Sequence, residues 1–175
     1  MTTQDSDLEW AITLEIPHLR RYARSLTRDA DVADDLVQSA LETALRKRRS
    51  WKRTGSVRSW MFSVLHRTFL DQQRAARRRR HWTGLFQSER HDDVEASPQE
   101  AWVERASILE ALGRLPDDQR AVILLVAVEG FGYDDVARIL NVPVGTVRSR
   151  LSRGREALSR QWDDHEERPR LRSVK

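Results

Sequence analysis

Six side chains able to contact nucleic acid recur along one predicted helix near the carboxyl end of the chain. This helix spans residues 144 to about 162, and apolar Val147 and Leu151 mark its inward face. Arginine presents a planar fork of donors that fits a guanine edge or a phosphate. The candidate contacts on the outward side are Thr146, Arg148, Ser149, Ser152, Arg153 and Arg155.

A second, shorter helix must hold this arginine face in place. Residues 133–140 have helical periodicity, and a turn at residues 141–143 joins them to the longer helix. Ala137 is small where two helices must approach closely, and Pro143 fixes the backbone of the turn. The pattern predicts a helix-turn-helix that binds duplex DNA. An ordinary helix pair with a solvated arginine face is the alternative.

Positive charge gathers in the middle of the chain. Residues 46–90 hold 14 basic and 2 acidic residues, a local balance of +12, whereas the whole chain has a net charge of only +4. The segment before this block has a balance of −5 and the segment after it −3. A basic groove with aromatic platforms such as Trp51 and Trp60 suits single-stranded DNA. Both tryptophans have an alternative role as core residues, favoured for Trp60 by its helical spacing to Val64.

Composition excludes several classes of protein. With 175 residues and 39% hydrophobic residues, the chain is too small for a large catalytic barrel. It has no cysteine, which removes disulfides, thiol catalysis and zinc ribbons, and its longest apolar stretch, residues 121–128, is too short to cross a membrane. We therefore expect a cytoplasmic protein without membrane insertion. The five histidines are scattered, so we expect no enzyme activity, metal or cofactor, although His66 adjoins Arg67 on the expected DNA face.

The periodicity predicts an all-α fold with two small helical domains joined by a flexible linker. The first domain spans residues 8–80. Its helical patterns cover residues 8–14, then a stretch to residue 26 that has Pro17 in its first turn, then residues 31–47 and 56–80. The linker covers residues 81–98, where periodicity fades and the composition turns acidic. The second domain, residues 99–163, carries the helix-turn-helix.

The motifs resemble a known family. Pro143-Val-Gly-Thr-Val-Arg-Ser-Arg-Leu151, preceded by Gly130-Phe-Gly-Tyr-Asp-Asp-Val-Ala137 and by Leu115-Pro-Asp-Asp-Gln-Arg120, resembles the promoter-binding domain of bacterial RNA polymerase sigma factors of the extracytoplasmic-function (ECF) subgroup. In the amino-terminal half, Asp34-Asp-Leu-Val-Gln38 resembles the family's polymerase-binding helix, and Trp60-Met-Phe-Ser-Val-Leu65 its promoter-melting helix. The resemblance covers roughly residues 10 to 162.

This resemblance implies a promoter-specific initiation factor. The first domain would bind core RNA polymerase and open the minus-ten element, and the second would read the minus-thirty-five element as duplex. The implied partners are core polymerase, promoter DNA as duplex and as melted strand, and an anti-sigma protein, with the free chain a monomer. The implied contacts to melted DNA are Trp51, Val64, Arg67, Arg74, Arg77 and Arg78; those to core polymerase are Asp34, Asp35, Leu36 and Gln38.

Two alternative functions stay open at the level of sequence. A helix-turn-helix regulator that binds only duplex DNA explains the carboxy-terminal half equally well, but it leaves the basic, tryptophan-bearing half without a role. An RNA-binding or interaction protein could use the arginine run at residues 77–80 without sequence preference. Transcription with purified core polymerase separates these possibilities from the sigma factor.

Overall fold

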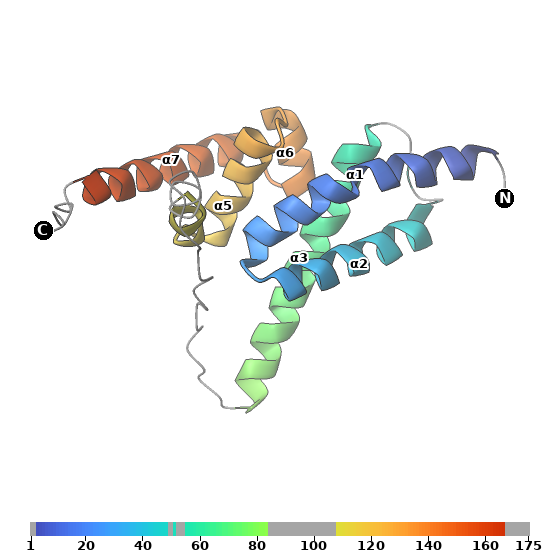
Figure 1. Ribbon diagram of the computed structural model, residues 1–175, viewed down its shortest axis with the longest axis horizontal. Helices are drawn as coiled ribbons and strands as arrows, with labels where there is room; N and C mark the ends of the chain where they lie inside the picture. The colour runs from blue at the N-terminus through green and yellow to red at the C-terminus, as the bar shows by residue number, and fades with distance from the viewer. Residues whose placement is uncertain (1–2, 49–50, 52–54, 84–107, 167–175) are drawn as a thin grey trace, which may run out of the picture.

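Three long helices make up the first half of the described chain: α1 (Thr3–Thr27), α2 (Ala30–Lys47) and α3 (Val57–Thr83). The computed structural model describes residues 3–48, 51, 55–83 and 108–166. Figure 1 shows α1 and α2 running antiparallel beside the upper part of α3, whose lower end extends beyond both. Each of the three helices contacts the other two, so the first half is a three-helix unit with one projecting end.

Short-range hydrogen bonds set the helix boundaries in this half. Arg28 takes a left-handed backbone conformation with φ 63° and ends α1. Asp29 then caps α2, because its carboxylate accepts a 2.9 Å hydrogen bond from the amide of Val32. Ser56 caps α3 as predicted, with its hydroxyl oxygen 3.0 Å from the donating amide of Ser59. These caps satisfy amide groups that have no partner within the helix itself.

Each of the three helices buries one apolar stripe against the others. Burial of one large apolar side chain contributes about 1.5–3 kcal/mol, which makes this stripe the main source of stability for the unit. Trp60 and Val64 are only half-buried at the edge of the core. The fully buried large side chains are Leu19, Tyr22, Leu26, Leu36, Met61, Phe62 and Leu65.

Pro17 does not begin a helix, in contrast to the sequence prediction. It lies inside α1, which continues unbroken from Thr3 to Thr27. A proline in a helix interior removes one backbone hydrogen bond and costs about 3 kcal/mol. Leu8 and Ile12 before it, and Leu19 after it, are all buried in the same core. Packing on both sides of Pro17 therefore keeps the helix continuous.

The second half consists of shorter helices. Residues 108–113 are helical, and they are followed by α5 (Asp117–Ile123), the π-helical segment η2 (Leu124–Val128), α6 (Tyr133–Leu140) and α7 (Val144–Glu166). The longest apolar stretch of the sequence, residues 121–128, therefore lies in α5 and η2. This stretch is buried from residue 121 to residue 125, whereas Val128 is 44% exposed.

The predicted helix-turn-helix is confirmed. α6 and α7 have the expected bounds at their junction, and Asn141 ends α6 in a left-handed conformation with φ 54°. The amide of Val142 bonds to the carbonyl of Ala137 at 3.0 Å, which closes the turn before Pro143. Val147 and Leu151 are buried on the inward face of α7. Local sequence thus determines both the turn and the buried face of the second helix.

The two halves pack against each other, chiefly through α3 and α6. Phe62 of α3 and Phe131, just before α6, meet edge to face with ring centroids 5.0 Å apart. Figure 1 shows α5, α6 and α7 gathered at the upper end of α3. The buried residues of the two halves therefore form one continuous apolar cluster.

The predicted all-α class is confirmed, since the described residues contain helices and no strand. Helix α1 begins before residue 8, and α3 continues past residue 80 to Thr83. The rest of the proposed linker and the first residues of the proposed second domain, residues 84–107 together, lie outside the described residues. None of the described helices is long and apolar enough to cross a membrane.

Candidate nucleic-acid interface

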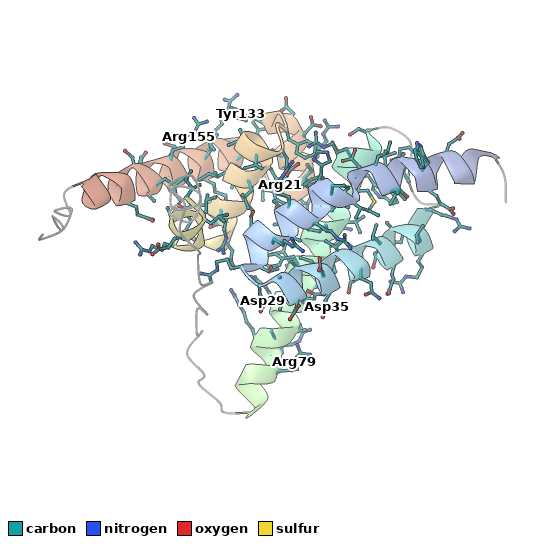
Figure 2. The ribbon with its side chains drawn as sticks, viewed as in Figure 1. Arg21, Asp29, Asp35, Arg79, Tyr133 and Arg155 are labelled. Carbon is teal, nitrogen blue, oxygen red and sulfur yellow. The ribbon has the colours of Figure 1, made fainter. Side chains whose placement is uncertain are left out.

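The outward face of α7 carries the predicted duplex contacts. Arg148, Ser152, Arg153 and Arg155 are exposed, whereas Thr146 and Ser149 are half-buried. The Ser149 hydroxyl donates a 3.0 Å hydrogen bond to the carbonyl of Thr146 one turn earlier. In Figure 2, Arg155 points away from the rest of the molecule. The helix therefore presents three arginines to solvent.

One arginine of α7 does not belong to this surface. Arg150 has a side chain only 27% exposed, and its Nε lies 3.0 Å from the carboxylate of Asp118 in α5. Its charge also helps to lower the pKa of His66 in α3. Arg150 therefore links α7 to α5, while the exposed side chains of Arg148 and Arg153 remain available to a ligand.

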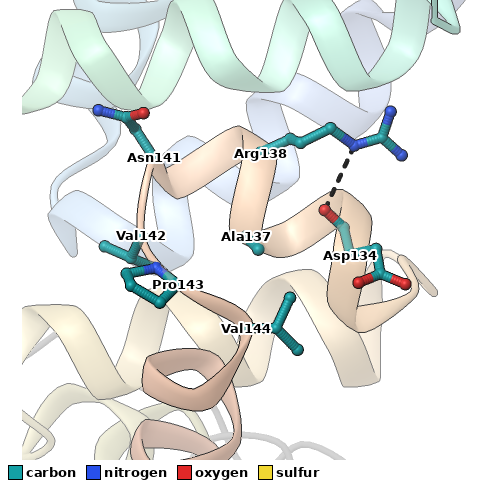
Figure 3. Close-up of a pocket in the computed structure, with 7 residues that line it drawn as sticks. All are labelled: Asp134, Ala137, Arg138, Asn141, Val142, Pro143 and Val144. Carbon is teal, nitrogen blue, oxygen red and sulfur yellow. Dashed lines mark hydrogen bonds between the residues drawn. The ribbon is translucent and has the colours of Figure 1, made fainter.

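A shallow hollow lies beside the helix-turn-helix (Figure 3). The side chain of Arg138 lies along α6, with Nε 3.3 Å from the carbonyl of Asp134 and one terminal nitrogen 2.6 Å from the Asp135 carboxylate. Residues of the turn line the hollow, and α7 begins directly after them. The residues that line the hollow are Asp134, Ala137, Arg138, Asn141, Val142, Pro143 and Val144.

The second basic surface follows α3. Arg67, Arg74, Arg77 and Arg78 are exposed. Of these, Arg74 pairs with Asp71, at 3.3 Å on the same helix. Arg79, labelled in Figure 2, marks the end of α3 that projects from the bundle. The predicted arginine contacts thus lie on the exposed side of a single long helix.

The two predicted aromatic platforms lie together. Trp51 and Trp60 stack with ring centroids 6.0 Å apart and an interplanar angle of 28°. Both are half-buried and pack against the core, as does Val64 one helical turn beyond Trp60. Trp51 therefore packs inward with one part of its side chain, while another part remains open to solvent.

The predicted polymerase contacts divide between surface and core. Asp34, Asp35 and Gln38 are exposed on α2, and Asp35 is labelled on that helix in Figure 2. Asp34 also lies 3.7 Å from both Arg20 and Arg24 of α1. Leu36 is fully buried. Its placement among the contact residues is therefore wrong for this structure, because the helix period turns it toward α1 and α3.

The sequence suggested that His66 lies on the DNA face, but the structure buries this residue. It is 8% exposed, and its Nδ1 lies 3.4 Å from the hydroxyl of Tyr22. Burial, with a smaller contribution from Arg150, lowers the pKa of His66 to about 4. Burial also raises the pKa of Tyr22, and the charge of Glu129 acts in the same direction. The histidine is therefore neutral at pH 7 and belongs to the interior.

Sequence reasoning missed a cluster of residues between the two halves. Glu129 is 3% exposed and contacts Arg21, Arg58 and His18 of the first half. One available signal was its position, since an acidic residue directly follows the apolar run and precedes Gly130. Phe62, in the middle of the recognised α3 motif, is also buried there. Among the described residues, no group of three histidines, cysteines or acids could hold a metal.

Two family descriptions match this chain. The family described as Sigma-70, region 4 matches residues 105–158, which include the helix-turn-helix. The family described as the Sigma2 domain of PhyR matches residues 12–66, which include most of the three-helix unit. Both descriptions are of sigma-type domains, and the two matches fall on the helical unit and on the helix-turn-helix in that order.

Curated relatives identify the subgroup. The ECF RNA polymerase sigma factor EcfG of Rhodopseudomonas palustris (strain TIE-1) is 37% identical over 148 residues, which is 85% of this chain and 81% of the relative. SigM of Mycobacterium tuberculosis (strain H37Rv) is 36% identical over 143 residues, 81% of this chain and 70% of the relative. The chain therefore belongs to the ECF RNA polymerase sigma factors, which are factors for promoter-specific transcription initiation.

Solved structures agree with this assignment. The sigma factor RpoE from Bartonella quintana, in complex with the anti-sigma factor NepR, is 31% identical with a TM-score of 0.74. The match covers 90% of this chain and 97% of that one. CnrH, in complex with the cytosolic domain of CnrY, has a TM-score of 0.66 at 24% identity, which supports the fold.

Proposed function

We propose that this sigma factor divides promoter recognition between its two halves. The first half binds core RNA polymerase and opens the minus-ten element, while α7 reads the minus-thirty-five element as duplex. The observation that carries the proposal is the separation of two exposed arginine surfaces, one on α7 and one on α3. One surface belongs to a helix-turn-helix and the other lies on the helix that continues from the stacked tryptophans.

Contacts by α7 would supply sequence recognition. Arg148 and Arg153 project from the face opposite buried Val147 and Leu151, so they enter the major groove when the helix docks there. Bidentate contact with a guanine discriminates by about 1–3 kcal/mol against the wrong base. Thr146 and Ser149 lie nearer the start of the helix, where amide groups and short side chains suit phosphate contacts. This division assigns base contacts to the two arginines and phosphate contacts to Thr146 and Ser149.

The surface of α3 would hold the melted strand. Trp51 offers a face on which an unstacked base can stack, at about 1–3 kcal/mol per base. Val64 and Arg67, one and two turns beyond Trp60, would complete the pocket for a flipped base. Arg74, Arg77 and Arg78 continue along the helix, where exposed guanidinium groups neutralise phosphates. The strand would therefore follow α3 toward its projecting end.

The energy of melting supports core polymerase as the required partner. Opening about ten base-pair steps at ~1.4 kcal/mol each costs on the order of 14 kcal/mol. The stacked pair of Trp51 and Trp60 can recover only part of this amount. The remainder must come from a larger assembly, and the exposed acidic face of α2 with Asp34, Asp35 and Gln38 offers the contact surface for it.

An anti-sigma protein is the second proposed partner. RpoE of Bartonella quintana is described in complex with the anti-sigma factor NepR, and CnrH in complex with the cytosolic domain of CnrY. We infer that the free chain is a monomer that exchanges such a partner for core polymerase in the cytoplasm. Copurification followed by mass spectrometry identifies the partner, and sedimentation of the purified chain gives its oligomeric state.

Transcription in a purified system tests the proposed function. Core polymerase is combined with the chain and a library of genomic fragments, and transcripts are mapped at their 5′ ends. We expect defined start sites that are absent with core polymerase alone, and permanganate-reactive thymines near each start. The double variant Arg148→Ala/Arg153→Ala should lose these starts while still binding core polymerase.

Two results would contradict this proposal. Specific duplex binding without initiation would identify a helix-turn-helix regulator instead. Equal binding of RNA and of unrelated DNA, with no start site, would favour an RNA-binding protein that uses its arginines without sequence preference.

A further inference from the structure

The turn between η2 and α6 inserts a carboxylate and a phenyl ring into the first half of the molecule. Glu129 ends η2, and the next residue, Gly130, has φ +70°, a conformation that side chains rarely adopt. This turn lets Glu129 and Phe131 point into the same contact. Their side chains are buried, with residue exposures of 3% and 8%. We call the segment of residues 129–131 the plug.

Cations of the first half surround the carboxylate of the plug. Arg21 of α1 donates from Nε to Oε1 of Glu129 and from Nη2 to Oε2 of Glu129, both at 3.0 Å. Arg58 of α3 donates from Nη2 to Oε2 at 2.9 Å. The hydrogen bond to Glu129 raises the pKa of Arg21. The carboxylate of Glu129 is therefore buried but fully paired.

Further polar contacts complete this site. His18 of α1 has Nδ1 3.4 Å from Oε2 of Glu129 and 3.0 Å from Arg21. Glu15, also on α1, lies 3.4 Å from Nε of Arg58. The guanidinium of Arg58 is thus held between a carboxylate of its own half and one of the other half. Each ionic partner of the Glu129 carboxylate comes from the first half of the chain.

Aromatic packing continues the same contact. Phe131 meets Phe62 edge to face at 5.0 Å. The guanidinium carbon of Arg58 lies 4.9 Å from the centre of the Phe131 ring and 5.8 Å from that of Phe62. Cation–π contacts at such distances add to the ionic one. The socket for the plug therefore consists of Arg21, Arg58, His18 and Phe62.

Solvent reaches the cationic side of the socket. The side chains of Arg21 and Arg58 are 49% and 33% exposed, whereas that of Glu129 is not exposed at all. Leaving the socket would let water solvate Glu129, and both arginines already touch water. Contacts between domains of one chain are commonly of this releasable, partly polar kind. The ion pairs of Glu129 make the contact between the plug and the socket strong. Because the arginines are already partly in water, the two halves can still separate there.

Two additional hydrogen bonds join the halves away from the plug. Nη1 of Arg28 donates to the carbonyl of Gly113 at 3.0 Å, and the side-chain amide of Gln73 donates to Asp117 at 2.6 Å. Arg28 and Asp117 are at least partly exposed. Water can replace exposed hydrogen bonds at little cost, whereas a buried carboxylate cannot lose one partner without penalty. The plug is thus the contact on which closure depends most.

We propose that the plug is an intramolecular ligand that holds the two halves closed, and that core polymerase binds the open form. The second part rests on the proposed function, in which each half contacts a separate promoter element. Closure fixes α7 relative to α3, whereas promoter engagement needs the two arginine surfaces to be positioned independently. A chain whose competent form is only a fraction of the population binds with an affinity reduced by that fraction.

Distance measurements in solution test closure without any partner. The chain has no cysteine, so Leu45→Cys in α2 and Ser159→Cys in α7 provide two exposed sites for spin labels. Double electron–electron resonance on the full chain should give one dominant distance. Glu129→Gln keeps the shape of the side chain and removes its charge. We expect it to add a broad population at other distances and to raise the open fraction about tenfold or more.

Variants on the opposite side of the contact control for misfolding of the turn. Arg21→Ala/Arg58→Ala leaves the second half unchanged and should open the chain as Glu129→Gln does. Arg20→Ala/Arg24→Ala removes the same charge from α1, where these residues pair with Asp34 of the same half, and should retain the parent distance. If Glu129→Gln and Arg21→Ala/Arg58→Ala both keep the distance of the parent as the dominant one, the plug does not hold the two halves closed.

Binding to core polymerase tests the second part separately. Glu129→Gln should bind core polymerase more tightly than the parent, by the same factor as its rise in open fraction. An opened variant with unchanged affinity would overturn the link to polymerase. If neither protein binds core polymerase, the proposed function fails, while the distance measurement still decides the plug.

Discussion

A Cβ atom on Gly154 would lie 2.5 Å from Cδ1 of Ile123. Gly154 is buried on the face of α7 that also holds Val147 and Leu151. Helices α7 and α5 therefore approach each other here more closely than a larger residue allows unless Ile123 is displaced. The contact between Gly154 and Ile123 therefore helps to set the distance between α7 and α5.

Gly154→Ala should accordingly destabilise the protein. Alanine gains up to about 1 kcal/mol of helix propensity over glycine, but overpacking a buried contact costs about 1–3 kcal/mol. We expect the free energy of unfolding to fall by about 1 kcal/mol, measured by urea denaturation with circular dichroism. Gly145→Ala, on the same helix with open space around the new methyl group, should not destabilise. Equal effects at the two positions would show that the contact with Ile123 is easily relieved.

Arg148→Ala and Arg153→Ala should weaken binding to the minus-thirty-five duplex. Each loss is about 1–3 kcal/mol if the arginine makes a bidentate contact to a base, and specificity relaxes at that base. Competition with single-base variants of the promoter measures both effects. Arg160→Ala, exposed farther along α7, should weaken all sequences alike. If Arg148→Ala leaves binding unchanged at every sequence and salt concentration, that residue is not in the interface.

Arg77→Ala/Arg78→Ala should reduce the salt dependence of binding to melted promoter DNA. Each contact with a single-stranded phosphate contributes about −0.7 to the slope of log affinity against log salt concentration. Loss of two contacts should therefore lower the slope by about 1.4 on a template with a preformed bubble. A slope equal to that of the parent would mean that these arginines are only solvated.

Asp35→Ala/Gln38→Ala should reduce the affinity for core polymerase without unfolding α2. Both side chains are exposed, and the side-chain amide of Gln38 donates a 3.2 Å hydrogen bond to Glu42 of the same helix. Thermal unfolding should consequently be close to that of the parent, while competition for core polymerase becomes weaker. Competition as strong as that of the parent would place the polymerase contact elsewhere on the surface.

His66 should make the stability of the protein sensitive to mild acid. Its pKa is about 4 in the folded protein, against 6.5 as the ordinary value. Between pH 6.5 and 4 the unfolded chain binds a proton that the folded chain does not, so acid favours unfolding. The stabilisation present above pH 6.5 is lost as the pH falls toward 4, and it amounts to about 3 kcal/mol.

His66→Gln provides the comparison for this effect, because glutamine has no proton to gain. Urea unfolding at pH 7 and at pH 4.5 should show a smaller loss of stability in the variant than in the parent. Tyr22 and Arg150, which face His66 from α1 and α7, are retained in both proteins. Parallel losses would mean that other groups account for the acid sensitivity.

Local sequence was sufficient for much of the fold and for the surface residues of the site. Val147 and Leu151 are spaced by one helical turn, which indicates the buried face of α7 and leaves Arg148 and Arg153 outside. The same reasoning failed for His66, which is buried beside Tyr22 of another helix once the helices pack together. It also failed for Pro17, because packing on either side overrides the local cost of a proline.

The sequence by itself determined the helices, the helix-turn-helix and the family, since capping, turns and apolar periodicity depend on residues a few positions apart. Only the tertiary structure decided that Glu129 meets Arg21 and Arg58, which are 108 and 71 positions away along the chain. Periodicity carries no information about such pairs. A buried carboxylate is tolerated where folding brings cations to it, and those cations are known only once the two halves are packed together.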